Sequence, residues 1–346
     1  MTDTPLVSVI IPTFNSEKYI GRCLSALALN AYPALEVIIV DAGSTDQTRA
    51  IVGSFQFILS IRYLTLSPST QSEARNVGLK NASGKYIAFC DSDDFFLPGK
   101  IKKQVDAVEK NQADVVYFDA LHFYSDRQSK FFINRTQQTN DMLASSIHCL
   151  MMNLNAMLVR KSFLDKNQLT FPQGEMGRYA EDWNFVFHLA LHHAKFFKLD
   201  EHLAVVEVRK DSHTQWSLQW KMKSVVIQFL TDNRSQMSPY HQSLVDESVK
   251  NLQRKMIVGL VLAGQFAEAK ALFKSLTLSS RRSGVYPGML KSGAGSSIGF
   301  FFLRLFPKKL LDKIIITLWE RNRKKHRQTY VKLNAGTQKY LNEILG

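Results

Sequence analysis

The sequence is poor in cysteine and has no long apolar run. Cys23, Cys90 and Cys149 stand far apart, with no Cys-x-x-Cys or Cys/His spacing, which argues against a disulfide framework and a zinc site and favours a reducing compartment. No apolar run reaches the roughly 18 residues of a membrane-spanning helix. Residues 1–5 lack the basic and apolar parts of a signal peptide. We therefore expect a cytoplasmic chain, either soluble or bound at the inner face of a membrane.

Acidic residues are in the minority. Lys and Arg exceed Asp and Glu by 44 − 30 = 14, so an anionic partner is expected: a nucleotide, a nucleic acid or an acidic membrane surface. Half of this excess falls between Phe300 and Tyr330, a segment with nine basic residues and only two acidic ones, Asp312 and Glu320. The apolar fraction of 45% nevertheless supports a real core and excludes a disordered chain.

An apolar run that ends in three carboxylates is the most informative stretch. The run 86–89 is short and rich in aromatic and branched residues, which predicts a buried strand of a parallel sheet. Asp91, Asp93 and Asp94 follow, where open α/β sheets bind ligands. Clustered carboxylates repel unless a cation lies among them, so Asp-x-Asp indicates a Mg²⁺ or Mn²⁺ site that also holds a phosphate. The alternative is a solvated acidic turn that caps a helix starting near Pro98.

The N-terminal residues predict the opening of a βαβ unit. Val7–Ile11 reads as a buried strand stopped by Pro12, and Asn15 or Ser16 can cap a helix with apolar residues at helical spacing. A second apolar run over 35–40 then follows. We expect both strands to end at the same edge of the sheet.

Asp41 closes the second run and precedes a turn of small and hydroxyl-bearing residues, 42–48, which we expect to cap the next helix. A carboxylate in that place suits hydrogen bonding to a ribose or a base edge. A dinucleotide-binding protein would have Gly-x-Gly-x-x-Gly in its first turn, and 12–15 is Pro-Thr-Phe-Asn instead.

Five motifs occur in a characteristic order: Val-Ser-Val-Ile-Ile-Pro-Thr-Phe-Asn at 7–15, Asp-Ala-Gly-Ser-Thr-Asp at 41–46, Glu-Ala-Arg-Asn-Val-Gly at 73–78, Gly-Lys-Tyr-Ile-Ala-Phe at 84–89 and Asp-Ser-Asp-Asp at 91–94. Their order and spacing resemble the family 2 glycosyltransferases of GT-A fold. The resemblance covers about residues 5–215. It implies a metal-dependent hexosyltransferase that uses a nucleotide-diphosphate sugar and inverts the anomeric centre.

The resemblance also implies roles for individual residues. The residues it places at the nucleotide-sugar donor are Pro12, Thr13, Asp41, Arg75, Asp91 and Ser92. It makes Asp93 the main ligand of the divalent metal, with Asp91 beside it. The family often has two acids where this chain has Asp41-Ala42, which leaves the base of the nucleotide less defined. A diphosphate also calls for a fixed cation such as Arg75, although a surface helix residue is the alternative there.

Glu181 and Asp182 resemble the catalytic-base motif of the same family. An acceptor hydroxyl is a poor nucleophile, so inversion requires a carboxylate within hydrogen-bond reach of it. The resemblance implies Asp182 as base and Glu181 as its orienting neighbour or acceptor contact. The alternative is two acids that favour a helix N-terminus. At 208–213 the match is imperfect; it points to Arg209 or His213 at the diphosphate, or to an ordinary histidine.

The C-terminal part changes to helices without strands. We expect a GT-A catalytic domain over 1–215 and a helical region over 216–346, with a basic amphipathic segment at about 298–330. In that segment an apolar stripe rimmed by Lys and Arg favours either an interfacial helix on anionic lipid or a helix docked on the helical region. No nucleic-acid recognition module accompanies the charge, so nucleic acid is not an expected partner.

The function that these features predict is an inverting transferase with a nucleotide-diphosphate donor, a UDP-sugar by expectation. Its acceptor would be a glycan or a lipid-linked glycan of cell-surface polysaccharide such as capsule or lipopolysaccharide. A nucleotidyltransferase would need a glycine-rich first turn, which is missing here. The remaining alternative is a membrane-surface binding protein on a degenerate transferase domain.

Overall fold

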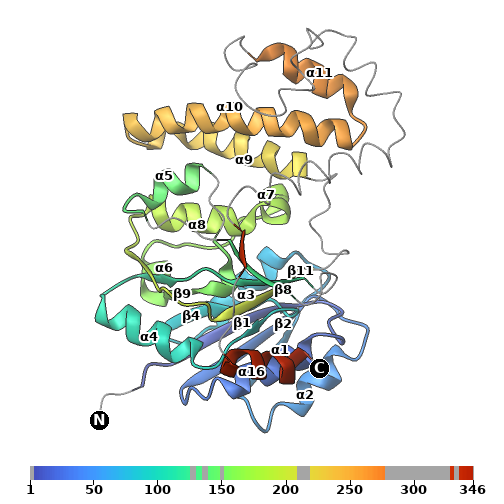
Figure 1. Cartoon of the computed structure of the whole chain (residues 1–346), viewed down its shortest axis with the longest axis vertical. Helices are drawn as coiled ribbons and strands as arrows, with labels where there is room; N and C mark the ends of the chain where they lie inside the picture. The colour runs from blue at the N-terminus through green and yellow to red at the C-terminus, as the bar shows by residue number, and fades with distance from the viewer. Residues whose placement is uncertain are drawn as a thin grey trace. The chain divides into compact units, whose positions relative to one another are not determined.

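The computed structural model describes residues 4–124, 130–134, 139–148, 152–208, 219–276, 328–330 and 335–345. It divides into two units (Figure 1): Met1–Met142, Leu150–Lys210 and Gln328–Gly346 form the first, and Leu143–Cys149 and Asp211–Arg327 the second. The boundary expected at 215/216 falls outside the described residues. The division also differs from the expected helical region 216–346, because residues 328–346 belong with the first unit.

The first unit is built on a mostly parallel sheet. Its strands, in spatial order, are β10 (Phe196–Lys198), β6 (Val115–Tyr117), β9 (Met157–Arg160), β4 (Tyr86–Phe89), β1 (Val7–Thr13), β2 (Leu35–Asp41) and β3 (Ile61–Thr65). All neighbours are parallel except β9, which runs antiparallel to both β4 and β6. Because helices cover both faces, the central strands are mainly apolar, and the mostly parallel sheet with its helices confirms the predicted α/β class.

Alternate residues of β1 point to opposite layers of helices. Val9 and Ile11 join the core cluster that contains residues of α1 (Ile20–Leu29) and α4 (Lys100–Lys110). Ile10 faces α3 (Gln71–Asn81), where a Cβ on Gly78 would lie 2.4 Å from Ile10 Cγ2. The absence of a side chain at Gly78 therefore lets α3 approach the sheet closely.

Phe89 of β4 lies on the same face of the sheet as Ile10. Its ring meets Phe171 and Phe185, the latter from α8 (Glu181–Leu191), edge to face. The remaining helices of the unit, apart from one at its C-terminal end, are α2 (Thr48–Ser54), η1 (Leu154–Ala156), α6 (Lys161–Lys166) and α7 (Gly174–Tyr179).

Two local predictions near the N-terminus were wrong. β1 continues through Pro12 to Thr13, because β4 pairs only as far as Ile10 and β2 alone accompanies β1 beyond it, so the missing N–H of proline interrupts no ladder. Helix α1 begins at Ile20 with no side-chain cap, and not after Asn15 or Ser16. The Ser16 carbonyl, rather than its hydroxyl, accepts from the amides of residues 19 and 20.

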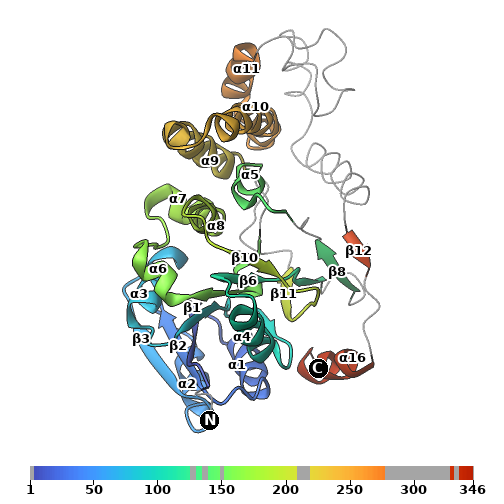
Figure 2. The same cartoon turned by 90° about the vertical axis from the view of Figure 1, so that its left-hand side faces the viewer.

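A second sheet lies in the first unit. Its order is β12 (Gln328–Tyr330), β8 (Lys130–Asn134), β7 (Leu121–Tyr124), β11 (Ala204–Val208) and β5 (Phe95–Phe96). β7 and β8 are antiparallel, with Leu121 opposite Ile133 and Tyr124 opposite Lys130. Figure 2 shows β12 beside β8, which it pairs with in antiparallel register.

The end of the chain packs on the first unit through α16 (Ala335–Leu345). Leu341 is fully buried in a cluster with Ala26 of α1 and Phe95 of β5. The Tyr340 hydroxyl donates to the Phe96 carbonyl at 3.1 Å. Burial of this apolar face explains why the last residues belong with the first unit and not with the helices of the second unit.

The second unit contains helices. They are α9 (Gln219–Asn233), η3 (Arg234–Gln236), α10 (Pro239–Leu262) and α11 (Phe266–Ser275), with α5 (Met142–Ile147) starting at the boundary. Gly264, with a φ of +76°, ends α10 and allows α11 to fold back, so that Leu260, Phe273 and Leu276 share a core. The basic segment at about 298–330 lies outside the described residues up to 327. Among the helices that are described, none is long and apolar enough to cross a membrane.

Candidate active site

The first three central strands end at one edge of the sheet, as the sequence predicted. Thr13 at the end of β1 pairs with Asp41 at the end of β2. Asp91 follows β4, which pairs with β1 in parallel, so Asp91 lies at the same edge. This edge is where open α/β sheets bind their ligands.

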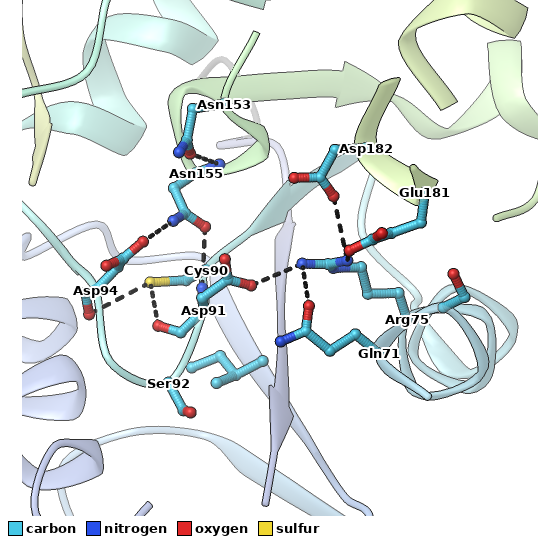
Figure 3. Close-up of polar contacts among 12 residues, drawn as sticks. Gln71, Arg75, Cys90, Asp91, Ser92, Asp94, Asn153, Asn155, Glu181 and Asp182 are labelled. Carbon is cyan, nitrogen blue, oxygen red and sulfur yellow. Dashed lines mark hydrogen bonds and ion pairs between the residues drawn. The ribbon is translucent and has the colours of Figure 1, made fainter. Parts of the chain in front are cut away.

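Arg75 is the centre of the polar contacts at this edge (Figure 3). Its guanidinium lies 2.8 Å from Asp91, 3.3 Å from Glu181 and 3.3 Å from Asp182. Gln71, one turn earlier on α3, accepts from Nη2 at 3.4 Å. The side chain is only 1% exposed, so the alternative of a surface helix residue was wrong.

The N-terminus of helix α3 is held in place by two sets of contacts, which positions Arg75 on the helix. Thr70 and Glu73 form a capping box in which each side chain bonds the backbone amide of the other. Ser72, on the first turn, is buried and donates to the Gly177 carbonyl at 2.9 Å. Arg75, three residues after Ser72, lies on the same side of the helix and is also buried. It also lies over the ring of Phe171, with Cζ 5.4 Å from the centroid.

One cation lies among three carboxylates in this group, and the pKa values of Arg75 and Asp182 are shifted from their ordinary values. Burial lowers the pKa of Arg75, but Asp91, Asp182 and Glu181 outweigh it and raise the pKa above the ordinary value. Burial raises the pKa of Asp182 to about 8; Arg75 opposes this rise, and the charges of Glu181 and Asp91 add to it. Such a carboxyl group exchanges a proton near neutral pH, which suits a general base.

Glu181 and Asp182 form the first turn of α8, as predicted, with Ala180 before them. Both therefore lie at the helix N-terminus, and the dipole alternative describes part of their setting. It does not describe all of it, because both carboxylates also contact Arg75 and lie 17% and 29% exposed. The structure thus brings Asp91 together with two adjacent acids that lie about 90 residues further along the chain.

The acidic loop, Asp91–Asp94, is held in a tight turn. The Asp94 amide donates to the Asp91 carbonyl at 3.0 Å, and Ser92 Oγ lies 2.8 Å from Ser16 Oγ. The Asp94 carboxylate is 3% exposed and accepts from the Glu207 amide at 2.9 Å. The alternative of a solvated turn therefore fails for Asp94, whose pKa is raised well above its ordinary value by burial and by the charges of Asp93 and Asp91.

Asn155 ties the acidic loop to the sheet, and sequence reasoning missed this. Its Oδ1 accepts from the Asp91 amide at 2.9 Å, its Nδ2 donates to the Asp94 carboxylate, and the side chain is fully buried. The one available signal was a polar residue just before an apolar run. Because β9 is antiparallel to β4, its amino end meets the carboxyl end of β4, and the sequence did not indicate this reversal.

The carboxylates present fit a hard divalent cation of the kind that uses few protein ligands. Within the described part of the chain, no group of three or more His, Cys, Asp or Glu side chains is placed to hold a metal ion. Mg²⁺ and similar ions are often held by one or two carboxylates together with the phosphates of a substrate. Asp93 and Asp91 can provide that number of oxygen ligands.

Asp41 is at the predicted edge but is already engaged by protein groups. Its Oδ1 accepts from the Ser44 amide at 2.9 Å and from the Ser44 hydroxyl at 2.6 Å, and its Oδ2 accepts from Tyr63. It is 2% exposed, and Thr13 beside it is 3% exposed. Phe14, by contrast, is 57% exposed at this edge, and sequence reasoning did not single it out. Arg209 and His213 lie outside the described residues.

The sheet and the grouping of acids at its carboxyl edge define an α/β domain with a candidate ligand site at that edge, and comparison with known proteins agrees on the fold. The family model described as glycosyl transferase family 2 matches residues 8–167. Over residues 8–167 the chain is therefore similar to the family 2 glycosyltransferases, and it has the GT-A type of fold.

Two relatives illustrate the likeness in sequence. Poly(ribitol-phosphate) beta-N-acetylglucosaminyltransferase TarS of Staphylococcus aureus is 38% identical over 113 residues, which is 32% of this chain and 20% of that protein. The uncharacterized glycosyltransferase EpsJ of Bacillus subtilis is 27% identical over 61% of this chain and 63% of its own length. The chain thus spans less than two thirds of each of these relatives.

Solved structures show the same fold. The crystal structure of TarS 1–349 in complex with UDP-GlcNAc superposes with a TM-score of 0.55, at 21% identity, over 77% of this chain and 83% of that one. Mannosyltransferase PcManGT from Pyrobaculum calidifontis, in complex with GDP-Man and Mn²⁺, gives 0.56 at 17% identity over 92% and 88%. Both similarities concern the fold.

Proposed function

We propose that this protein is an inverting glycosyltransferase. It moves one sugar from a nucleotide-diphosphate donor, a UDP-sugar, to a hydroxyl group of a glycan or lipid-linked acceptor in cell-surface polysaccharide synthesis. The observation that carries the proposal is the buried Arg75, which joins Asp91 of the acidic loop to Glu181 and Asp182 at the start of α8. Arg75 thereby connects the proposed donor-binding residue Asp91 with Glu181 and Asp182, the residues proposed to act on the acceptor.

Asp182 is the proposed catalytic base. Its carboxylate takes the proton of the acceptor hydroxyl while that oxygen bonds to the anomeric carbon and the bond from that carbon to the diphosphate oxygen breaks. The environment that raises its pKa to about 8 makes it a stronger base than an ordinary aspartate. Glu181, 17% exposed beside it, orients the base or contacts the acceptor.

Arg75 and the edge residues bind the donor. Arg75 supplies a fixed positive charge close to where the diphosphate must lie, and its hydrogen bond to Asp91 orients that carboxylate. Pro12, Thr13, Asp41 and Ser92 line the same edge. Phe14, whose ring is largely exposed there, offers a face on which the nucleotide base can stack. The resemblance adds Arg209 or His213 as a further contact to the diphosphate.

A divalent metal, Mn²⁺ or Mg²⁺, is the proposed cofactor, with Asp93 as its main protein ligand and Asp91 beside it. When bound, such an ion neutralises the negative charge that develops on the departing diphosphate. Several carboxylates in a short loop are unfavourable without a cation, which supports this assignment.

The relatives support the choice of donor and of setting. TarS is named as an N-acetylglucosaminyltransferase and has been crystallised with UDP-GlcNAc and UDP, which favours a UDP-sugar here. The excess of 14 positive charges suits a nucleotide donor and also an anionic membrane surface that carries a lipid-linked acceptor. A peripheral location at the inner face of the membrane is part of this proposal.

The test is nucleotide release from a panel of nucleotide sugars, with Mn²⁺ or with EDTA. We expect metal-dependent turnover of one donor. Asp93→Ala should abolish it, and Asp182→Asn should lower kcat by about 10² to 10⁴ with little change in donor KM. Asp165→Asn is the matched control. Asp165 is 60% exposed, forms an ion pair with Lys161 one helical turn earlier, and has no part in the proposed site.

Two results would contradict the proposal. The first is a folded wild type that neither turns over nor binds any nucleotide sugar but still associates with anionic vesicles, which would favour the non-catalytic binding protein. The second is turnover that survives Asp182→Asn with the rate of the Asp165→Asn control, which would remove Asp182 as base.

A further inference from the structure

Arg22 reaches from α1 to the acidic loop. Its Nη2 donates to the Asp93 carbonyl at 2.9 Å and also to the carboxylate of Glu207 on β11. The guanidinium lies over the ring of Phe95, with Cζ 5.1 Å from the centroid. The Arg22 side chain is 19% exposed and that of Glu207 9%, so water screens these contacts weakly.

Glu207 completes a closed ring of contacts around the loop. Its carboxylate pairs with Arg22, while its own amide donates to the Asp94 carboxylate at 2.9 Å. Arg22 therefore holds the carbonyl of the peptide between Asp93 and Asp94, the Asp91 carbonyl accepts from the amide of that peptide, and Glu207 holds the Asp94 side chain. Fixing the Asp93 carbonyl fixes the plane of that peptide and with it the direction in which the Asp93 side chain leaves the backbone.

Arg22 and Arg75 contact different residues of the loop. Arg75 forms its ion pair with the Asp91 carboxylate, while Arg22 bonds the Asp93 carbonyl.

We propose that Arg22 is a positioning residue for the donor-bound metal: it holds the Asp93 peptide so that the Asp93 carboxylate is presented in one orientation to the cation. This role rests on the proposed function, because it requires that Asp93 bind a metal. Outer partners of metal ligands typically contribute about 10-fold to 100-fold to metal affinity. Arg22 acts through Asp93 and does not touch the reacting atoms.

The first measurement needs neither substrate nor metal. The amides of Asp91 and Asp94 are hydrogen-bonded within the protein, so their hydrogen exchange reports opening of the loop. In Arg22→Met we expect peptides that cover 91–97 to exchange about 10-fold faster, because a charge-assisted hydrogen bond is lost. Arg22→Lys, which keeps the charge, should give an intermediate rate.

The second measurement is the affinity for Mn²⁺·UDP by titration calorimetry. We expect Arg22→Met to bind about 10-fold to 100-fold more weakly, and the Mn²⁺ concentration for half-maximal turnover to rise while kcat at saturating Mn²⁺ changes little. Should Arg22→Met fail to fold, Glu207→Gln takes its place. That variant keeps the bond from Arg22 to the Asp93 carbonyl but weakens the ring, so a smaller shift in the same direction is expected.

Arg62→Met is the matched control. Arg62 also donates to a backbone carbonyl, that of Asn81 at 2.6 Å, and faces a glutamate, Glu36, at 3.8 Å. It lies at the start of β3, at the other edge of the sheet from the acidic loop. This variant should leave both the exchange of 91–97 and the Mn²⁺·UDP affinity unchanged.

The possible failures are separable. If the wild type does not bind Mn²⁺·UDP, the proposed function falls and the metal role of Arg22 falls with it. If the wild type binds but Arg22→Met leaves exchange and affinity unchanged, only the role of Arg22 is refuted. If Arg62→Met shifts both readouts as much as Arg22→Met does, the effect is general loosening, and the positioning role is again refuted.

Discussion

Lys100 is a fully buried lysine whose amine has no hydrogen-bond partner among the described residues, and its replacement by methionine should stabilise the protein. The side chain is 0% exposed, and Nζ lies 3.6 Å from the centroid of the Phe96 ring. Burial lowers its pKa from the ordinary 10.5 to about 7, and the nearby Cys90 opposes this fall only in part. The protein therefore spends folding free energy to keep this group inside.

The size of the effect follows from the difference between the two pKa values. The difference of 10.5 − 7 = 3.5, at about 1.4 kcal/mol per pH unit, amounts to about 5 kcal/mol. Below pH 7 the amine is protonated in the folded and the unfolded chain, so the whole cost is present. Between pH 7 and 10.5 only the unfolded chain holds the proton, and stability rises with pH. Above 10.5 the cost is gone.

The assay is urea unfolding of the wild type and Lys100→Met, followed by tryptophan fluorescence. We expect the variant to be more stable by about 4 kcal/mol at about pH 7 and by about 1 kcal/mol at about pH 10. Lys103→Met is the control on the same helix: its side chain is 47% exposed and pairs with Glu201, so the change should stay within about 0.5 kcal/mol.

Two outcomes would refute this reasoning about Lys100. One is a variant no more stable than the wild type at neutral pH, which would mean that the amine finds a polar partner in solution. The other is a gain that is equal at both pH values, which would assign the effect to packing rather than to ionisation.

Three further predictions concern other parts of the first unit. With the free enzyme, kcat/KM for the donor should rise with pH through about 8, because Asp182 acts as a base only when deprotonated; an activity that is flat from pH 6 to 9 in rate assays would contradict this. Gly78→Ala should cost about 1 to 3 kcal/mol in denaturant unfolding, because its Cβ would fall 2.4 Å from Ile10 Cγ2, whereas Gly53→Ala, with nothing within 4 Å, should be neutral or stabilising. Equal effects of the two glycine changes would refute the packing argument. Leu341→Ala should cost about 2 to 5 kcal/mol and lower the melting temperature seen by calorimetry, because Leu341 is fully buried; an unchanged melting temperature would show that α16 does not stay docked.

Periodicity and end signals were enough to predict several elements because the physical cause is local. The apolar runs 35–40 and 86–89 became β2 and β4, which are buried on both faces and so read as continuous apolar stretches. Acids after these runs could be assigned to the sheet edge by topology rules alone. Glu181 and Asp182 were likewise found at the start of a helix.

Local signals failed where a residue's partner comes from far along the chain. Pro12 appeared to end a strand because its ring removes a donor, yet the lost donor faces no neighbour, since β4 has already ended. The cap expected from Ser16 is absent because its hydroxyl bonds Ser92 instead, 76 residues away. Residues 328–346 return to the first unit through pairing with β8 and burial of Leu341.

By itself, then, the sequence determined the α/β class, the order of the strands along the chain and the identity of the acids at the sheet edge, since these depend on patterns within one segment. Only the tertiary structure decided which charges meet. The antiparallel entry of β9 brings Asn155 to the acidic loop, and the packing of α3 buries Arg75 among three carboxylates. Ionisation at this site is set by burial and by neighbours distant in sequence, and both exist only once the chain has folded.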